Sequence, residues 1–230
     1  MLFRSRSLAA IFGDLEKNPN VRAVMLTGAP REDGRACFCA GADLRDGTLE
    51  EGSKLARIAF GLIERLPKPV IAAIGGVAVG GGLELALTCD LRVIARSSRL
   101  GVPEINIGSM PRAGGTQRLP ALIGEAEAKK LLFSGDLIDG DEAFRIGLAT
   151  QVVPDGEERS AAMALAQRLA AKAPLALAAI KRVVRDGRHL PHEAALDMEI
   201  EIGRSLDGTA DRHEGRAAFL EKRTPRFTGK

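Results

Sequence analysis

Residues 71–90 read IAAIGGVAVGGGLELALTCD, and this stretch decides the fold of the chain. The apolar run at residues 70–74 is typical of a strand buried on both faces, as in a parallel sheet. The glycines after it indicate a turn, and LELAL predicts a helix that begins near Gly81 or Gly82. A strand, a glycine turn and a helix N-terminus therefore follow one another directly.

Such a turn exposes backbone N–H groups at the start of a helix. These first amides have no partner inside the helix, and the helix dipole favours negative charge beside them. The spacing is neither G-x-G-x-x-G nor a P-loop, which argues against a nucleotide phosphate. Glycines are also typical of close packing. The turn is therefore predicted to form either an oxyanion hole or a tight packing contact.

Two glutamates are the candidate acid and base. Glu84 lies within LELAL, and Glu104 follows 20 residues later in GVPEINIG. Glu84 could merely complement a helix dipole on the surface, and a surface role is equally open to Glu104. In an apolar setting, however, desolvation moves a glutamate pKa toward neutrality and suits the side chain to proton transfer. Two carboxylates that share a pocket can hold different protonation states.

The segments around this stretch alternate between helix and strand. Helical periodicity is followed by an apolar run twice, and Pro67 ends the second helix. This alternation predicts an α/β layer with parallel strands. The expected helices are 8–15 and 55–66, and the expected strands are 21–27, a brief strand at 36–40, 70–74 and 91–95.

From Pro120 onward the sequence is rich in Ala and Leu and is predicted to be mostly helical. We divide the chain into an α/β core at 1–172 and a helical C-terminal region at 173–230. The expected helices are 125–133, 141–146, 157–171, 175–185, 192–206 and 210–222, with one strand within 148–153.

The composition excludes several classes of protein. The 230 residues are 45% hydrophobic and 27% charged, which is enough for a real core. A net charge of +3 and 3% aromatic residues offer little to nucleic acid. Glycines interrupt the longest apolar stretch, so no membrane span is expected.

The cysteines and histidines bear on compartment and metal binding. Three cysteines leave one unpaired in any disulfide scheme, which favours a reducing compartment. The start of the chain shows no signal-peptide pattern, so we expect a cytoplasmic protein. The three histidines lie far from the cysteines, and no metal site is expected.

Three motifs resemble the central blocks of the enoyl-CoA hydratase/isomerase, or crotonase, family. They are FCAGADL at 38–44, KPVIAAIGGVAVGGGLELALTCDLRV at 68–93 and PEINIGSMPRAGGTQRLP at 103–120. The resemblance covers nearly the whole chain, although the family's first strands have no counterpart. It implies a spiral of ββα units with a helical C-terminal trimerisation region, assembled as a homo-trimer or dimer of trimers.

The resemblance also assigns roles to residues. The backbone amides of Ala42 and Gly81 would hold the thioester carbonyl oxygen, Glu84 would activate water, and Glu104 would supply the α-proton. Together they imply a lyase, an enoyl-CoA hydratase of fatty acid metabolism (β-oxidation). It would add water to a 2-enoyl-CoA and form a 3-hydroxyacyl-CoA, with coenzyme A as part of the substrate and no separate cofactor.

Further residues are candidates for substrate binding by the same resemblance. The segment with Ala40 and Asp43 would meet coenzyme A, and Arg45 would meet a phosphate, although a solvated loop charge is equally open for it. Lys222 and Phe227 would reach a neighbouring subunit's coenzyme A, or else form a flexible basic tail. Arg112 replaces a glycine usual in hydratases, and its guanidinium could lower the glutamate pKa values or narrow the pocket.

Other functions are also consistent with the same fold. The ending EKRTPRF and the run GGGLELAL lean toward a methylglutaconyl-CoA hydratase, and an enoyl-CoA isomerase is a further candidate. Arg112 also leaves open a non-catalytic member that binds coenzyme A. The resemblance leaves open RNA binding as well, since one member of the family binds RNA.

Overall fold

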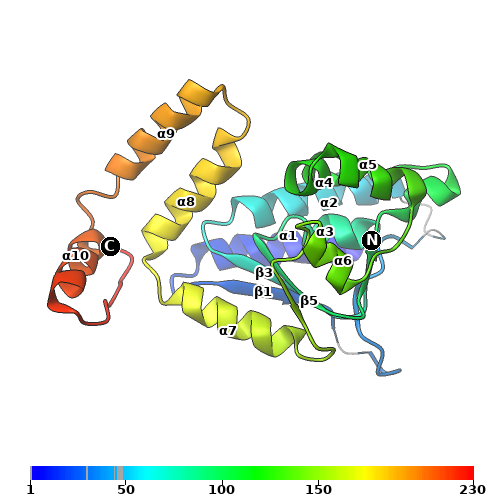
Figure 1. Cartoon of the computed structure of the whole chain (residues 1–230), viewed down its shortest axis with the longest axis horizontal. Helices are drawn as coiled ribbons and strands as arrows, with labels where there is room; N and C mark the ends of the chain where they lie inside the picture. The colour runs from blue at the N-terminus through cyan, green and yellow to red at the C-terminus, as the bar shows by residue number, and fades with distance from the viewer. Residues whose placement is uncertain (1, 30, 44, 46–48) are drawn as a thin grey trace.

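Two parallel sheets form the centre of the chain in the computed structural model, which describes residues 2–29, 31–43, 45 and 49–230 (Figure 1). The four-stranded sheet has the order β1-β3-β5-β7, and the three-stranded sheet has the order β2-β4-β6. The strands of the larger sheet are β1 (Val24–Thr27), β3 (Val70–Ile74), β5 (Leu91–Ala95) and β7 (Gln151–Val153). Those of the smaller sheet are β2 (Cys37–Cys39), β4 (Val77–Val79) and β6 (Arg99–Gly101).

Helices follow the strands in a repeating order. The pairs β1/β2, β3/β4 and β5/β6 each place one strand in either sheet, and a helix follows each pair. This is the predicted spiral of ββα units. The helices of this part are α1 (Leu2–Lys17), α2 (Leu49–Arg65), α3 (Gly81–Ala86), the 3-10 helix η1 (Pro103–Ile107), α4 (Gly115–Ile123), α5 (Glu125–Ser134), α6 (Gly140–Arg145) and α7 (Glu158–Ala170).

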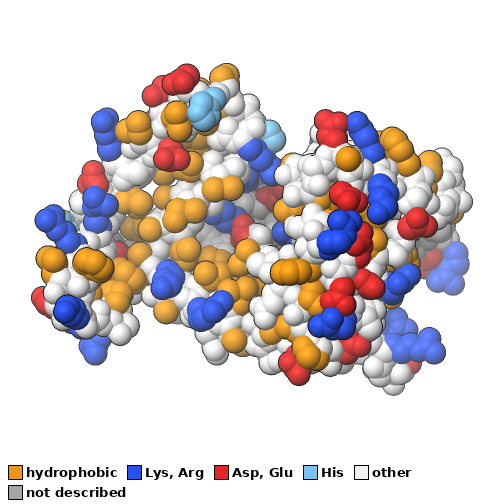
Figure 2. Space-filling view, in the orientation of Figure 1, with side chains coloured by type: hydrophobic (Ala, Val, Ile, Leu, Met, Phe, Trp, Pro, Cys, Tyr) orange, Lys and Arg blue, Asp and Glu red, His pale blue; other side chains and the backbone are white. Residues whose placement is uncertain are grey.

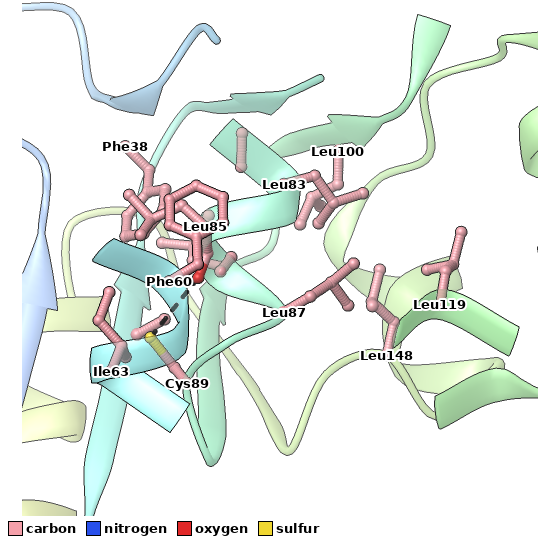
Figure 3. Packing of buried hydrophobic residues seen from close by; sticks show 14 of the residues in the cluster. Phe38, Phe60, Ile63, Leu83, Leu85, Leu87, Cys89, Leu100, Leu119 and Leu148 are labelled. Atoms are coloured by element: carbon pink, nitrogen blue, oxygen red, sulfur yellow. Dashed lines mark hydrogen bonds between the residues drawn. The ribbon is translucent and has the colours of Figure 1, made fainter. Parts of the chain in front are cut away.

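Strand β3 lies at the centre of the core, and all five of its side chains are buried. Ile71 and Ala73 belong to the apolar cluster under α7, whereas the alternate residues belong to the main cluster on the opposite face. Phe60 and Ile63 of α2 and Leu83 of α3 contribute to that main cluster (Figure 3). Both faces of the sheet are therefore covered, which explains why the strand is apolar throughout.

The C-terminal helices extend away from this body. Helices α8 (Pro174–Gly187) and α9 (His192–Arg204) form a hairpin, and α10 (Ala210–Glu221) lies beyond it near the C-terminus (Figure 1). Apolar side chains gather over this part of the surface (Figure 2). Among the most exposed are Ile180, Val184, Phe219 and Leu220, which are 60–83% exposed. The predicted boundary between residues 172 and 173 lies in the turn between α7 and α8.

No single helix in the described part of the chain is long and apolar enough to cross a membrane. Helices α7 and α8 meet that test only together, and they are bent by 109° at the break between them.

The strands predicted at 70–74 and 91–95 are confirmed, and the C-terminal helices lie within a few residues of their predicted ranges. Three expectations are wrong. The first strand begins at Val24 rather than at residue 21, the first helix begins at Leu2 rather than at residue 8, and α4, which contains Pro120, was not predicted.

A single glycine turn between β3 and α3 was predicted, but the short strand β4 lies within this segment. Gly76 has φ +71°, and a Cβ there would lie 1.8 Å from the Ala36 carbonyl oxygen. Only glycine fits this close crossing, at which the chain steps from the larger sheet to the smaller one.

Candidate active site

Glu84 is buried, with 3% of its surface exposed, and it accepts two backbone hydrogen bonds. Its Oε1 atom lies 2.8 Å from the amide nitrogens of both Ala113 and Gly115. Gly115 is the first residue of α4, so Glu84 occupies the N-terminus of that helix, where amides lack intrahelical partners. Glu84 therefore complements the N-terminus of α4, and the surface role considered for Glu84 is excluded because the side chain is buried.

Glu104 has the opposite environment. It lies in the first turn of η1, and its buried Oε2 atom has no hydrogen-bond partner within the described residues. Burial raises the pKa of Glu104 above its ordinary value, and the negative charge of Glu84 raises it further, against a lowering by its own backbone N–H. A glutamate in this environment favours the protonated form and is suited to act as an acid.

Two free amides lie beside the glutamates. Within the described ranges, neither the Ala42 nor the Gly81 N–H donates to an acceptor of the chain. The two segments touch at Gly41, which has φ +85°, and a Cβ on Gly41 would lie 3.3 Å from the Gly81 nitrogen. Two segments about 40 residues apart in sequence thus place two free amides close together, which is the arrangement that an oxyanion hole needs.

The contacts of Gly80 join these pieces into one site. A Cβ on Gly80 would lie 3.0 Å from the Glu104 Oε1 atom, and Gly80 directly precedes Gly81. Its positive φ of 55° also starts α3, which carries Glu84. The structure therefore brings together the four predicted catalytic positions, of which one carboxylate accepts two amides and the other is desolvated.

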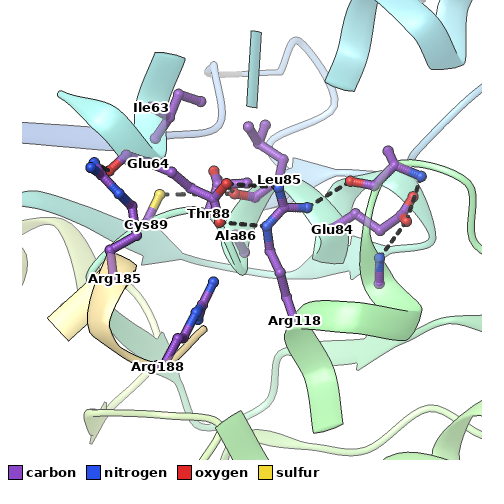
Figure 4. Close-up of polar contacts among 12 residues, drawn as sticks. Ile63, Glu64, Glu84, Leu85, Ala86, Thr88, Cys89, Arg118, Arg185 and Arg188 are labelled. Atoms are coloured by element: carbon purple, nitrogen blue, oxygen red, sulfur yellow. Dashed lines mark hydrogen bonds and ion pairs between the residues drawn. The ribbon is translucent and has the colours of Figure 1, made fainter. Parts of the chain in front are cut away.

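Sequence reasoning missed two supporting residues. Arg118 of α4 donates to both carboxylate oxygens of Glu64 on α2, at 2.6 and 2.8 Å, and to the Ala113 carbonyl oxygen at 2.7 Å (Figure 4). The contact with Glu64 spans 54 residues of sequence. No local pattern reports a pairing over that distance.

The candidate substrate-binding residues near the site are exposed. Ala40 lies at the surface after β2, and Arg112 is exposed, so its guanidinium does not plug the space between the glutamates. Arg45 is 91% exposed and binds Asp43 through its Nε, its Nη2 and its own amide. These contacts lower the pKa of Asp43 to about 2. Their role in binding a substrate stays a prediction.

The two C-terminal candidates lie elsewhere in the chain. Lys222 ends α10 in the left-handed conformation, and the ring of Phe227 packs against Gly215 of the same helix. Figure 1 places α10 at the opposite side of the molecule from α3 and α4. A single chain therefore does not bring Lys222 or Phe227 to the glutamates.

Comparisons with known proteins find similar chains over nearly the whole length of this one. The family described as enoyl-CoA hydratase/isomerase matches residues 5–230. The chain is 40% identical over 219 residues to a crotonyl-CoA hydratase of Syntrophomonas wolfei, covering 93% of this chain and 83% of the relative. It is 38% identical over 225 residues to the mitochondrial methylglutaconyl-CoA hydratase of Rattus norvegicus, with 94% and 70% covered. A crystal structure of an enoyl-CoA hydratase from Bacillus anthracis superposes with a TM-score of 0.95 at 38% identity, with 100% and 90% covered.

The raised pKa of Glu104 predicts how stability depends on pH. A carboxyl whose pKa is raised by folding favours the folded state below the ordinary value of 4.5, and that contribution is lost as the pH rises through the raised value. Since glutamine does not titrate, Glu104→Gln should gain stability relative to the native chain as the pH rises from 4.5 to 8. Urea unfolding at several pH values measures this difference.

Glu125→Gln is a control of opposite sign. Lys129 lowers the pKa of Glu125, so this variant should lose stability relative to the native chain as the pH rises from below 4.5. A stability difference for Glu104→Gln that does not change with pH would contradict the assignment.

Proposed function

Because the chain belongs to the enoyl-CoA hydratase/isomerase family, we propose that it is a lyase that hydrates a 2-enoyl-CoA to a 3-hydroxyacyl-CoA. One observation carries the proposal: two glutamates in opposite environments lie beside two free amides. Hydration needs a base for water, an acid for carbon and donors for a developing oxyanion. The site offers each of these within the chain, and coenzyme A enters only as part of the substrate.

The two amides stabilise the charge that develops during the reaction. The thioester carbonyl oxygen accepts hydrogen bonds from Ala42 and Gly81, and it becomes enolate-like when water attacks the β-carbon. Donors that are fixed before the reaction cost no reorganisation, and one such donor is worth about 10²–10³ in rate. Gly81 begins α3, whose dipole adds to this stabilisation.

The two glutamates move the protons. The water oxygen bonds to the β-carbon while Glu84 takes one proton from that water. Glu104, favoured in its protonated form by burial, gives its proton to the α-carbon. The product has gained one water, and the proton on Glu84 must return to Glu104 before the next turnover.

A second candidate is hydration of an enoyl-CoA whose acyl chain ends in a carboxylate, such as methylglutaconyl-CoA. Arg112 favours this substrate, because a guanidinium can pair with a carboxylate. Arg112 is exposed, and it directly precedes Ala113, whose amide donates to Glu84. No ion pair of Arg112 occurs among the described residues. A similar relative is a methylglutaconyl-CoA hydratase.

We also propose that the chain assembles as a trimer or a dimer of trimers. The exposed apolar side chains of α8 and α10 support this, since exposed apolar side chains that gather on one part of a surface are typical of subunit contacts (Figure 2). In such an assembly Lys222 and Phe227 would contact a neighbour's coenzyme A, with Ala40, Asp43 and Arg45 binding from the chain itself. Three free cysteines among the described residues support a place in the cytoplasm. Hydration of a 2-enoyl-CoA, as proposed above, supports a role in β-oxidation.

Substitution of either glutamate should abolish most hydration. Glu84→Gln and Glu104→Gln should each lower kcat for crotonyl-CoA by about 10²–10⁴-fold, because each removes one partner of proton transfer. Loss of the enoyl absorbance and the product mass, greater by one water, measure the reaction.

Glu125→Gln, an exposed change on α5, is the matched control and should keep the native rate. A shifted double bond with no gain in mass would indicate an isomerase instead. Near-native hydration by either glutamate variant would contradict the mechanism, and coenzyme A or RNA binding without turnover would indicate a non-catalytic member.

Arg112 distinguishes the two classes of substrate. If it pairs with an acyl carboxylate, Arg112→Gly should raise KM for methylglutaconyl-CoA about two- to five-fold, as expected for an exposed ion pair. KM for crotonyl-CoA should stay unchanged. An equal effect on both substrates would argue against recognition of the carboxylate.

Light scattering measures the assembly. The expected mass is three or six times 24.4 kDa, and Val184→Asp together with Phe219→Asp should lower it, since both side chains are exposed in the single chain. A monomer mass for the native protein at assay concentration would refute the trimer.

A further inference from the structure

Arg118 connects the segment that holds Glu84 to helix α2. Its Nε and Nη2 atoms donate to the two carboxylate oxygens of Glu64, while Nη1 donates to the Ala113 carbonyl oxygen (Figure 4). The side chains of Arg118 and Glu64 are only 16% and 23% exposed, so water competes weakly for these contacts. All three nitrogens of one planar guanidinium are therefore engaged, and its orientation is fixed.

The Ala113 carbonyl that Arg118 binds lies between the two amides that hold Glu84. The amides that hold Glu84 belong to Ala113 and Gly115, and the Ala113 carbonyl belongs to the peptide bond between them in the chain. Gly114 has φ +109°, and a Cβ there would lie 1.9 Å from the Arg118 Nη1 atom. The guanidinium therefore fills the space beside this turn and holds its shape.

We propose that Arg118, itself oriented by Glu64, is a positioning residue that sets the place of the Glu84 carboxylate for hydration. The inference rests on the proposed function. Arg118 fixes the turn at 113–115, the turn presents two amides at a fixed separation, and the amides hold Glu84 Oε1. A catalytic base that is misplaced by about 1 Å costs about 10²-fold in rate.

The competing explanation is that Arg118 and Glu64 simply join α4 to α2. In that case a substitution lowers stability or the amount of folded protein, and its effect does not depend on Glu84. If Arg118 instead acts through Glu84, a substitution of Arg118 should no longer lower the rate once Glu84 has been replaced. Residues that act as one unit have strongly non-additive effects on rate, so a double-mutant cycle separates the two explanations.

The cycle combines Arg118→Lys with Glu84→Gln in the full-length protein and uses crotonyl-CoA. Lysine keeps the charge but cannot bind both Glu64 and the Ala113 carbonyl with a planar fork. Arg118→Lys alone should lower kcat about 10–10²-fold with KM unchanged. In the Glu84→Gln background the same change should lower the residual rate less than about two-fold.

Glu64→Gln keeps the shape of the side chain and provides a second variant if Arg118→Lys does not fold. It should lower kcat in the same direction and should show the same loss of effect in the Glu84→Gln background. Arg96→Lys is the matched control, because it alters an exposed arginine pair with Asp141 on the surface and should leave kcat unchanged. Equal fold-losses in both backgrounds would overturn the inference.

A crystal structure of Arg118→Lys gives a readout that does not depend on activity. Glu84 Oε1 should no longer lie within hydrogen-bond distance of both amides, and retention of both 2.8 Å contacts would overturn the inference. If the native protein does not hydrate crotonyl-CoA but Glu84 moves in the variant, the proposed hydratase function fails while the positioning role stands.

Discussion

The site depends on the pair of hydrogen bonds from Ala113 and Gly115 to Glu84. A buried carboxylate without partners would be strongly unfavourable, and these two amides come from a helix end where N–H groups otherwise lack acceptors. The interaction therefore satisfies groups on α3 and α4 at once. It also fixes the distance between these helices. A Cβ at position 115 would lie 2.9 Å from Pro111 Cβ and 3.2 Å from Glu84 Oε1, so a side chain there would force one of these neighbours to shift.

The second glutamate shows the opposite solution. Glu104 reaches over Gly80 and leaves one buried oxygen without a partner in the described part of the chain, which raises its pKa. An unpaired polar atom costs stability, and such atoms are typical of functional sites. The two glutamates differ in role because one receives helix amides while the other receives none from its surroundings.

Local chemistry explains which features could be predicted. Strands β3 and β5 were predicted residue for residue because apolar runs bounded by turn residues have few alternative structures. Strand β4 was missed because three residues between glycines show no periodicity, and its pairing depends on β2 and β6 far away in the sequence. The glutamates and the glycine turn could be identified from their own sequence settings, and the family motifs added the two amide positions. Arg118 was missed because its partner Glu64 lies 54 residues away.

Three polar groups without a partner among the described residues lie near β2, α3 and η1, and their chemistry is complementary. The free amides of Ala42 and Gly81 require an acceptor oxygen, and Glu104 Oε2 lacks any partner among the residues described. In the proposed reaction, the carbonyl oxygen of the thioester accepts from both amides, and its α-carbon takes the proton of Glu104. The hydrogen bonds from both amides strengthen as the carbonyl oxygen becomes enolate-like, so the proposed site stabilises the transition state more than the substrate, which is the condition for catalysis.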